Sequence, residues 1–373
     1  MKNYFCVLLG LAVGLTACSV PNHDSQLETI LQQHNVPGMQ CMYYQDNGWL
    51  QGKQQQLYVL GDSISSQSVF QAASLSKVVF AYTVLRLVDQ GVLDLDTPLV
   101  DYYVWPRFAP DSLTQALASQ LTARHVLTHR TGLPNWAVSP SSDAWPTSSL
   151  QFLPETYAAA SAAASTAAPS ATDAAASSAQ PFHYSGEGFA YLQQVVEHIT
   201  GLSLNQLAER EVFTPMGMTS SWYGWRPSFE ATVTRGHRSD GTPTGIVRYA
   251  RANSAYTLMT CAPDYMRFLK ALVKGEGLRP ETFRSLTAPA PRVYEQLPVY
   301  WGLGVSLTED GAFWHWGDNG SFKCFFAAYP NRILVYFTNS YNGIEMLPDV
   351  LPLFFPEGDV LTIPEWIRRH DEE

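Results

Sequence analysis

The stretch FQAASLSK, residues 70–77, opens the most strongly helical segment of the chain. Apolar residues recur at i, i+3 and i+4 spacing through residues 74–90, which predicts a buried helix. Gly91 stands where a C-terminal cap belongs. Ser74 and Lys77 are three residues apart, so we expect them on the same face of this helix, one turn apart.

A serine and a lysine in this arrangement favour nucleophilic chemistry. A serine hydroxyl is a poor nucleophile until a base takes its proton, and a desolvated lysine has a lowered pKa that suits it for this task. The positive end of the helix dipole would stabilise negative charge that develops on a reacting oxygen. A bare Ser-x-x-Lys pattern is weak, because about one match is expected by chance in a chain of this length. Here, however, the pair opens the clearest buried helix, and only one of the six lysines has a serine three residues before it.

Two further stretches extend the pattern. GVLDLD at 91–96 and LTARHVLTHRTGLP at 121–134, taken with residues 70–77, resemble the serine β-lactamase and penicillin-binding-protein-like family, closest to its class C and esterase branch. The resemblance covers about 25–355. It implies an α/β fold of the β-lactamase/transpeptidase type: an antiparallel sheet flanked by helices, built from both chain ends, with an inserted helical domain. It also implies that Ser74 is the catalytic nucleophile and that Lys77 handles its proton.

The order of the predicted elements agrees with that organisation. Helical patterns cover 24–34, 187–200, 262–274 and 344–354, and strand-like runs cover 39–44, 56–60, 313–316, 322–329 and 333–338. We therefore divide the chain into a first α/β part at 24–95, a mainly helical part at 96–250, a second α/β part at 251–355 and a C-terminal tail at 356–373. An Ala/Ser-rich stretch at 158–179 lacks an apolar face and is predicted to be a flexible insertion.

The sequence Tyr184-Ser185-Gly186 precedes the predicted helix 187–200. In the family that the chain resembles, a Tyr-x-Asn motif stands here, and its tyrosine acts as general base and then as general acid. The resemblance thus implies a catalytic role for Tyr184, since a phenol near its usual pKa needs an adjacent cation such as Lys77 to act as a base. Without the resemblance, Tyr184 would be interpreted as an ordinary core or surface residue, since the chain has nineteen tyrosines.

The sequence His315-Trp316-Gly317 stands where the family has Lys-Thr-Gly on the strand that borders the site. The resemblance implies that His315 lies beside Tyr184 as a charge or a hydrogen-bond donor, and that Trp316 and Gly317 contact substrate. It also implies an oxyanion hole made by the backbone N–H groups of Ser74 and Asp318. The alternative for His315 is a half-buried strand histidine.

Two departures from the family pattern bear on the substrate. Gly186 replaces the asparagine that binds a substrate amide, and Trp316 replaces a threonine that helps to bind a substrate carboxylate. Both favour small esters or amides and an esterase-like serine hydrolase. The alternatives are a D-alanyl carboxypeptidase or class C-like β-lactamase acting on peptidoglycan-like substrates or antibiotics, and a catalytically silent binding protein of the cell envelope.

A metal site is disfavoured. His125 and His129 are four residues apart like a zinc-binding pair, but Val126 stands where a catalytic glutamate would be needed, and no third ligand is apparent. We therefore expect both histidines to be structural, and we expect no metal or organic cofactor. Three cysteines of the mature chain, Cys41, Cys261 and Cys324, are too few for a disulfide scaffold.

The N-terminus has the pattern of a targeting segment. A lysine at position 2, a short apolar stretch and the sequence Leu-Thr-Ala-Cys at 15–18 resemble a bacterial lipoprotein signal. This resemblance implies a signal peptide at 1–17, lipidation of Cys18 and a tether at 18–23. We expect a lipid-anchored protein of the bacterial cell envelope, facing the periplasm, and Ser19 favours the outer membrane. An ordinary secretory signal with a chance cysteine is the alternative.

Composition limits the remaining partners. The 373 residues are 46% hydrophobic and 15% charged, which is ample for a large buried core. The net charge of −10 argues against nucleic acid, because phosphate binding needs basic patches. The expected partners are thus a small-molecule substrate and a membrane reached through the lipid anchor. The sequence carries no indication of oligomeric state.

Overall fold

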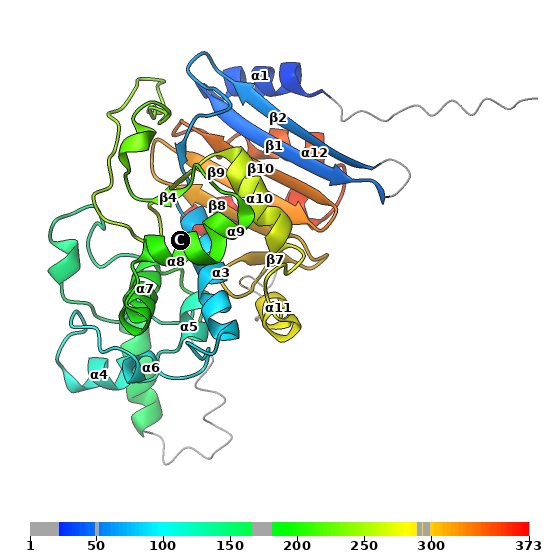
Figure 1. Cartoon of the computed structure of the whole chain (residues 1–373). Helices are drawn as coiled ribbons and strands as arrows, with labels where there is room; N and C mark the ends of the chain where they lie inside the picture. Colours follow the sequence, from blue (N-terminus) through cyan, green and yellow to red (C-terminus); the bar gives the residue numbers. More distant parts are fainter. Residues whose placement is uncertain (1–21, 49–51, 166–180, 289–292, 294–298, 373) are drawn as a thin grey trace, which may run out of the picture.

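A computed structural model describes residues 22–48, 52–165, 181–288, 293 and 299–372. Its central feature is a seven-stranded antiparallel sheet with the order β2-β1-β10-β9-β8-β7-β6 (Figure 1). The strands are β1 (Met39–Asp46), β2 (Lys53–Leu60), β6 (Val299–Trp301), β7 (Ser306–Thr308), β8 (Phe313–Asp318), β9 (Lys323–Tyr329) and β10 (Arg332–Thr338). Because β1 pairs with β10, the two ends of the chain meet inside one sheet.

Helices cover both faces of this sheet. On one face, α1 (Asp24–Gln33), α12 (Leu347–Phe354) and α13 (Ile363–Glu372) pack on side chains of β1, β8, β9 and β10. On the other face, α10 (Ala262–Leu272) packs on β10 and β1, while α3 (Leu75–Asp89) packs on β8. Successive strand residues point to opposite faces, so the uninterrupted aromatic and apolar runs of β8 to β10 fill both layers.

A mainly helical region lies beyond α3 and extends from the centre to the lower left of Figure 1. Its helices are α4 (Ser112–Ala118), α5 (Ala123–Leu127), α6 (Pro154–Ser165), α7 (Gly186–Thr200), α8 (Leu204–Ala208) and α9 (Thr214–Met216). The short helix α11 (Pro280–Thr287) packs against α3. Since α3 is buried on nearly all sides, it forms the seam between the helical region and the sheet.

A small three-stranded sheet leads into the start of α3. It has the order β3-β5-β4 and consists of β3 (Phe70–Gln71), β5 (Leu258–Thr260) and β4 (Trp222–Tyr223). The N–H of Ala72 donates to the carbonyl of Leu258 at 2.8 Å, which extends this pairing to the residues just before Ser74. The small sheet therefore fixes the position of the helix start.

The predicted fold class is confirmed: the chain has an antiparallel sheet flanked by helices within a mixed α/β architecture. The predicted helix 74–90 corresponds to α3, and Gly91 after it has a φ of 70°. Sequence patterns did not reveal β3 to β7, because strands of two or three residues are too short to show a period.

Two segments differ from the prediction. Helix α6 continues to Ser165, so the Ala/Ser-rich stretch begins as a helix; alanine favours helix, and Tyr157 and Ala160 pack against the core. The predicted C-terminal tail instead forms α13, whose Trp366 is fully buried. Pro356 and Gly358 precede this helix, and such residues usually mark a loop rather than the approach to a buried helix.

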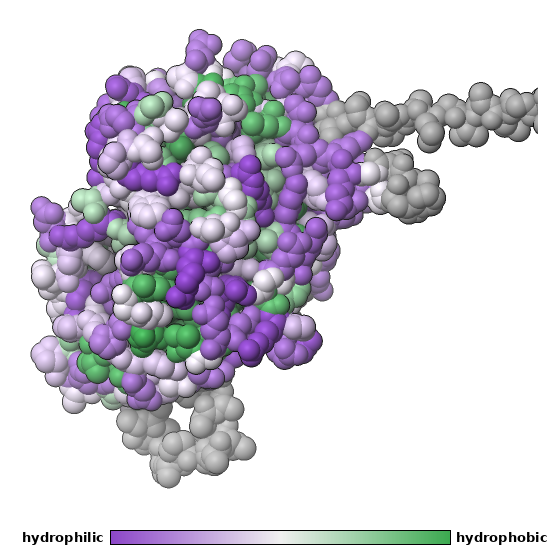
Figure 2. All heavy atoms as spheres, viewed as in Figure 1, coloured by the Kyte–Doolittle hydropathy of each residue, from purple (hydrophilic) through white to green (hydrophobic). Residues whose placement is uncertain are grey.

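Several predictions fall outside the described residues. They are the signal peptide at 1–17, most of the tether at 18–23, the lipidation of Cys18, and residues 166–179 of the insertion. Within the described ranges, none of the helices has the length and apolar character needed to cross a bilayer. In Figure 2, hydrophilic residues cover most of the visible face, with smaller hydrophobic areas between them.

Candidate active site

Ser74 lies at the N-terminus of α3, at the junction between the sheet and the helical region. It is partly exposed, whereas Ala73 and Leu75 on either side are fully buried. Ala73 has a φ of 44°, a left-handed conformation that costs an L-residue about 1–3 kcal/mol. The sharp turn that Ala73 makes lets the chain leave β3 and enter α3 with the Ser74 side chain at its corner.

Gly317 on β8 packs against the chain just before Ser74. A Cβ atom at this position would lie 2.9 Å from the carbonyl oxygen of Ala72 and 3.0 Å from the Cβ of Ala73. The thiol of Cys324 on β9 also donates to the Ala72 carbonyl, at 3.0 Å. Gly317 was expected to contact substrate; in the structure its close neighbours are the backbone and side chain of the turn before Ser74.

Lys77 is a buried lysine directed at Ser74. Its Nζ lies 3.2 Å from the Ser74 Oγ and 2.9 Å from the carbonyl oxygen of Ala255. Because the side chain is only 2% exposed, burial lowers the pKa of Lys77 to about 7. At neutral pH a large fraction of this amine is therefore unprotonated and able to accept a proton from Ser74.

Tyr184 comes from the segment before α7 and meets the same serine. Its hydroxyl is buried close to Ser74, whose side chain acts on its pKa, and the Lys77 Nζ lies 4.7 Å from the centre of its ring. Burial raises the pKa of Tyr184, and the interaction with Ser74 opposes part of that rise. The phenol therefore stays neutral at pH 7, while a protonated Lys77 would be stabilised by the ring face.

His129 holds Tyr184 in place, a role that the sequence did not reveal. Its imidazole stacks on the Tyr184 ring with centroids 4.2 Å apart and planes at 27°. Its Nδ1 accepts the Ser185 N–H at 3.0 Å, and its carbonyl accepts the His183 N–H at 2.8 Å. His125, four residues earlier, was expected to be structural, and it forms a capping box with Thr122 at the start of α5. In the described residues, no group of three metal-binding side chains comes together.

Gly186 is the first residue of α7, and an indole lies directly on it. A Cβ atom at this position would lie 2.3 Å from Cζ2 of Trp136. The Gly186 N–H donates to Oδ1 of Asn135 at 2.9 Å, which holds the loop that carries the indole. The structure thus explains the departure from Tyr-x-Asn: Trp136 occupies the space that a side chain at 186 would need.

His315 and Trp316 are consecutive residues of β8, and their ring centres lie 5.4 Å apart. His315 is fully buried, its Nδ1 lies 2.6 Å from the Trp316 carbonyl oxygen, and its ring centre is 6.2 Å from that of Tyr184. Trp316 is 8% exposed; it contacts Tyr184 at 5.8 Å and packs on Trp366 of α13 at 5.1 Å. Both predicted residues therefore border the tyrosine, and Trp316 does so from the core between β8 and α13.

The backbone N–H of Asp318, predicted to contribute to an oxyanion hole, lies at the end of β8. The Asn319 N–H donates to the Phe322 carbonyl, and Asp318 lies opposite Lys323. Since hydrogen-bonded and non-hydrogen-bonded pairs alternate in an antiparallel ladder, the Asp318 N–H points away from β9. Because Gly317 is packed on the turn before Ser74, this amide lies beside the start of α3.

A polar cluster joins three segments beside the site. Oε1 of Gln71 accepts from the Tyr249 hydroxyl at 2.6 Å and from Nδ2 of Asn319 at 3.0 Å. The same Nδ2 lies 3.2 Å from the Tyr256 carbonyl oxygen. These contacts span up to 248 positions of the chain, so no local sequence pattern could have shown them.

Known proteins share this chain's sequence pattern and fold. The model of the beta-lactamase family matches residues 23–350. Penicillin-binding protein 4 of Amycolatopsis lactamdurans is 24% identical, over 92% of this chain and 91% of that protein. Esterase EstB of Burkholderia gladioli is 37% identical over 76 residues, which are 20% of this chain and 19% of the esterase. The crystal structure of a D-stereospecific amidohydrolase from Streptomyces sp. has a TM-score of 0.68 at 15% identity, covering 91% of this chain and all of that one.

Proposed function

The chain belongs to the beta-lactamase family, whose members are serine hydrolases, and from that premise we propose that it hydrolyses small esters through an acyl-enzyme on Ser74. One observation carries the proposal. The buried amine of Lys77, whose pKa is about 7, and the buried phenol of Tyr184 meet at the Ser74 hydroxyl. A serine with a base in hydrogen-bond reach and a second proton carrier beside it is equipped for acyl transfer.

In the first half of the reaction, unprotonated Lys77 takes the Ser74 proton as Oγ bonds to the substrate carbonyl carbon. The carbonyl electrons move to its oxygen, which the N–H groups of Ser74 and Asp318 stabilise. The intermediate then expels the alcohol, which receives a proton from Tyr184 as the C–O bond breaks. The Lys77 ammonium returns a proton to Tyr184, so both groups end neutral and the acyl group stays on Ser74.

In the second half, water attacks the acyl carbon and gives its proton to the neutral pair of Lys77 and Tyr184. The bond between the acyl carbon and Oγ breaks, and the Ser74 oxygen takes the proton back. The acid product leaves and the starting protonation state is restored. These steps use side chains and backbone amides alone.

Small esters are favoured over amides by the site's departures from the family pattern. Gly186 offers no side-chain amide to a substrate, and Trp136 fills the space beside it. Trp316 offers an indole where the family has a threonine hydroxyl, so a substrate carboxylate gains no hydroxyl donor there. The local match to an esterase agrees with this preference.

A second candidate is a D-alanyl carboxypeptidase or β-lactamase activity. The nearly full-length match to a penicillin-binding protein supports it. A cell-envelope location through a lipid on Cys18 would bring the enzyme to the cell wall and is proposed with it. Mass spectrometry of the mature N-terminus tests that anchor: a lipid-modified Cys18 is expected as the first residue, and an N-terminal residue without lipid would refute it.

Parallel kinetics separate the candidates. A short-chain p-nitrophenyl ester should be hydrolysed with a kcat/KM at least about a hundredfold above that for a chromogenic cephalosporin, a difference of about 2.7 kcal/mol in transition-state stabilisation. Faster turnover of the cephalosporin would transfer the assignment to the second candidate. Failure to hydrolyse either substrate, with the fold intact by circular dichroism, would favour a silent binding protein.

A further inference from the structure

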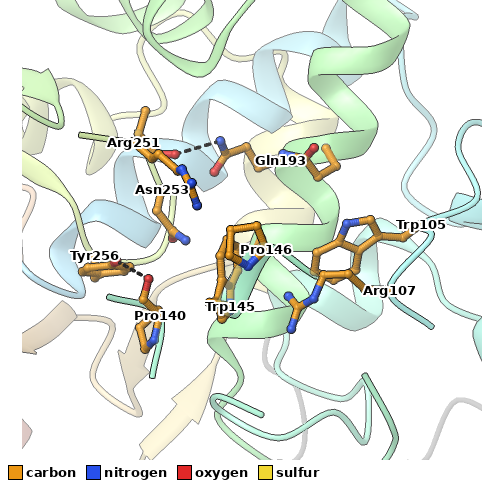
Figure 3. A pocket seen from close by; sticks show the side chains of 12 residues that line it. Trp105, Arg107, Pro140, Trp145, Pro146, Gln193, Arg251, Asn253 and Tyr256 are labelled. Atoms are coloured by element: carbon orange, nitrogen blue, oxygen red, sulfur yellow. Dashed lines mark hydrogen bonds between the residues drawn. The ribbon is translucent and has the colours of Figure 1, made fainter. Parts of the chain in front are cut away.

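A cavity near the candidate active site is separate from its reacting groups. It has a volume of about 220 Å³ and opens between α7, residues 251–256 and residues 140–146 (Figure 3). Its lining includes none of Ser74, Lys77 and Tyr184. The proposed hydrolysis leaves this cavity without a role.

Two hydrogen-bond donors point into the cavity. Asn253 is 5% exposed, and its Oδ1 accepts the Ala255 N–H at 2.9 Å, which turns its Nδ2 toward the cavity in Figure 3. Within the described ranges, this Nδ2 has no hydrogen-bond acceptor. The guanidinium of Arg251 extends toward the same space (Figure 3) and has no acidic partner in the described part of the chain. A ligand carboxylate at this point would accept from the Nδ2, and hydrogen bonds to a charged acceptor are stronger than those between neutral groups.

The opposite wall is aromatic and rigid. The Arg107 guanidinium lies 4.7 Å from the ring centre of Trp105 and 4.8 Å from that of Trp145. Its charge is neutralised by Glu187, with an N–O distance of 2.7 Å. On the other side, the Tyr256 hydroxyl donates to the carbonyl of Pro140 at 3.1 Å. The cavity thus has flat ring surfaces that hydrogen bonds and an ion pair keep in place.

The charge at this cavity is opposite to that of the whole protein. Two arginines line it and no aspartate or glutamate does, although the chain carries a net charge of −10. Since Glu187 neutralises Arg107, the uncompensated charge comes from Arg251. A guanidinium and an amide N–H₂ that line the same cavity can each donate to an oxygen of a carboxylate. The rings would cover an aromatic body.

We propose that this cavity binds the carboxylate of a small aromatic acid, with Arg251 and Asn253 as the recognition residues. The acid is either a free ligand or the remote end of a substrate. Its position matters for the reaction, because Asn253 holds the N–H of Ala255, and the carbonyl of Ala255 accepts from Lys77 at 2.9 Å. A ligand on Asn253 would therefore stabilise the segment that positions the catalytic lysine.

Calorimetric titration of the full-length Ser74→Ala protein with 3-phenylpropanoate tests the site without any turnover. The acid should bind at least about tenfold more tightly than the neutral 3-phenylpropanamide, as one charge-assisted contact implies. Arg251→Gln should weaken binding of the acid by about tenfold or more. Asn253→Asp, which retains the oxygen that accepts from Ala255 but loses the donor, should weaken it as well.

Arg279→Gln is the matched control, since Arg279 is exposed, precedes α11 and lies outside the cavity lining. It makes the same change in net charge and should leave the affinity unchanged. Equal affinities for acid and amide, or full affinity in the Arg251→Gln protein, would overturn the proposal. With the active enzyme, purely competitive inhibition of ester hydrolysis by the acid assigns the cavity to a substrate end. A change in kcat assigns it to a separate ligand.

Discussion

Lys77 links the chemistry of the site to the stability of the protein. Its pKa falls from 10.5 in the unfolded chain to about 7 in the folded one, because burial disfavours its charge. Between these values the unfolded chain binds the extra proton, so the free energy of unfolding should rise with pH. Relative to Lys77→Met, the wild-type protein should gain up to about 1.4 kcal/mol per pH unit above pH 7. Urea unfolding at pH 7 and pH 9 measures this gain.

The two proteins must be compared at each pH, because tyrosines and cysteines titrate in both. Below pH 7 the lysine is protonated in both states, so the difference between the proteins should level off. A difference that is constant from pH 6 to pH 9 would show that Lys77 keeps its ordinary pKa in the fold. It would then be unsuited to accept a proton at neutral pH.

We expect that only glycine fits at position 186, because the indole of Trp136 lies directly on it. Gly186→Ala places a methyl group 2.3 Å from the indole, and such overpacking costs about 1–3 kcal/mol. The better helix propensity of alanine offsets less than about 1 kcal/mol of this loss in stability at the first position of a helix. The substitution should therefore lower the free energy of unfolding, as measured by denaturant titration.

Trp136→Leu removes the indole and should relieve the steric clash with a methyl group at position 186. In its background Gly186→Ala should cost less than it does alone, giving a coupling energy above about 0.5 kcal/mol in a double-mutant cycle. Strictly additive effects would show that the indole does not lie on the glycine.

At the scale of single residues, sequence could identify Ser74 and Lys77 because they lie one helical turn apart. Tyr184 and His315 needed a resemblance to a family, since nothing local distinguishes them from other aromatic strand or loop residues. No local pattern in the sequence marks His129 or Trp136 as part of the site. Their contacts with Tyr184 and Gly186 cross about 50 positions, and only the folded chain brings them together.

At the scale of elements, the long periodic segments were predicted well, and the short or terminal ones were not. α3 and α7 bury broad apolar faces, and glycine ends both of them, so period and caps agree. Strands β6 and β7 have three residues each. Such short segments become strands because they pair with neighbouring strands, and their own sequence pattern does not predict it. The same holds for the sheet that precedes Ser74.

Helix α13 packs on the sheet, which the sequence pattern did not predict. It lies beyond residues 23–350, the part that matches the family, and its Trp366 packs on Trp314 and Trp316 of β8 at 5.1 Å each. Trp366→Ala should cost about 3–5 kcal/mol of stability, because it leaves a large cavity behind the strand that borders Tyr184. Thermal or urea unfolding measures the loss.

Leu361→Ala serves as the control for that substitution. Leu361 lies two residues before α13 and is 37% exposed, so its truncation should change stability by less than about 0.5 kcal/mol. Equal, small effects of both substitutions would mean that α13 does not pack on the sheet.

At the scale of the whole molecule, the order of the strands and helices along the sequence predicts that both chain ends build one sheet. A strand pair at the start and a strand group at the end leave unpaired edges unless they join, and β1 joins β10 over seven residue pairs. The site lies where this sheet, α3 and the helical region meet. Its residues come from positions 73 to 319, so only the complete fold assembles it.

The central claim is that Ser74, Lys77 and Tyr184 act together as one nucleophilic unit. A fluorophosphonate probe forms a covalent bond with an activated serine, and mass spectrometry of the digested protein locates the modification. Wild-type protein should be labelled on the peptide that contains Ser74, whereas Ser74→Ala should not be labelled. Lys77→Met and Tyr184→Phe should react at least about a hundredfold more slowly. As a control, Ser119→Ala, an exposed serine at the end of α4, should be labelled like the wild type. Undiminished labelling of the Ser74→Ala protein would contradict the account.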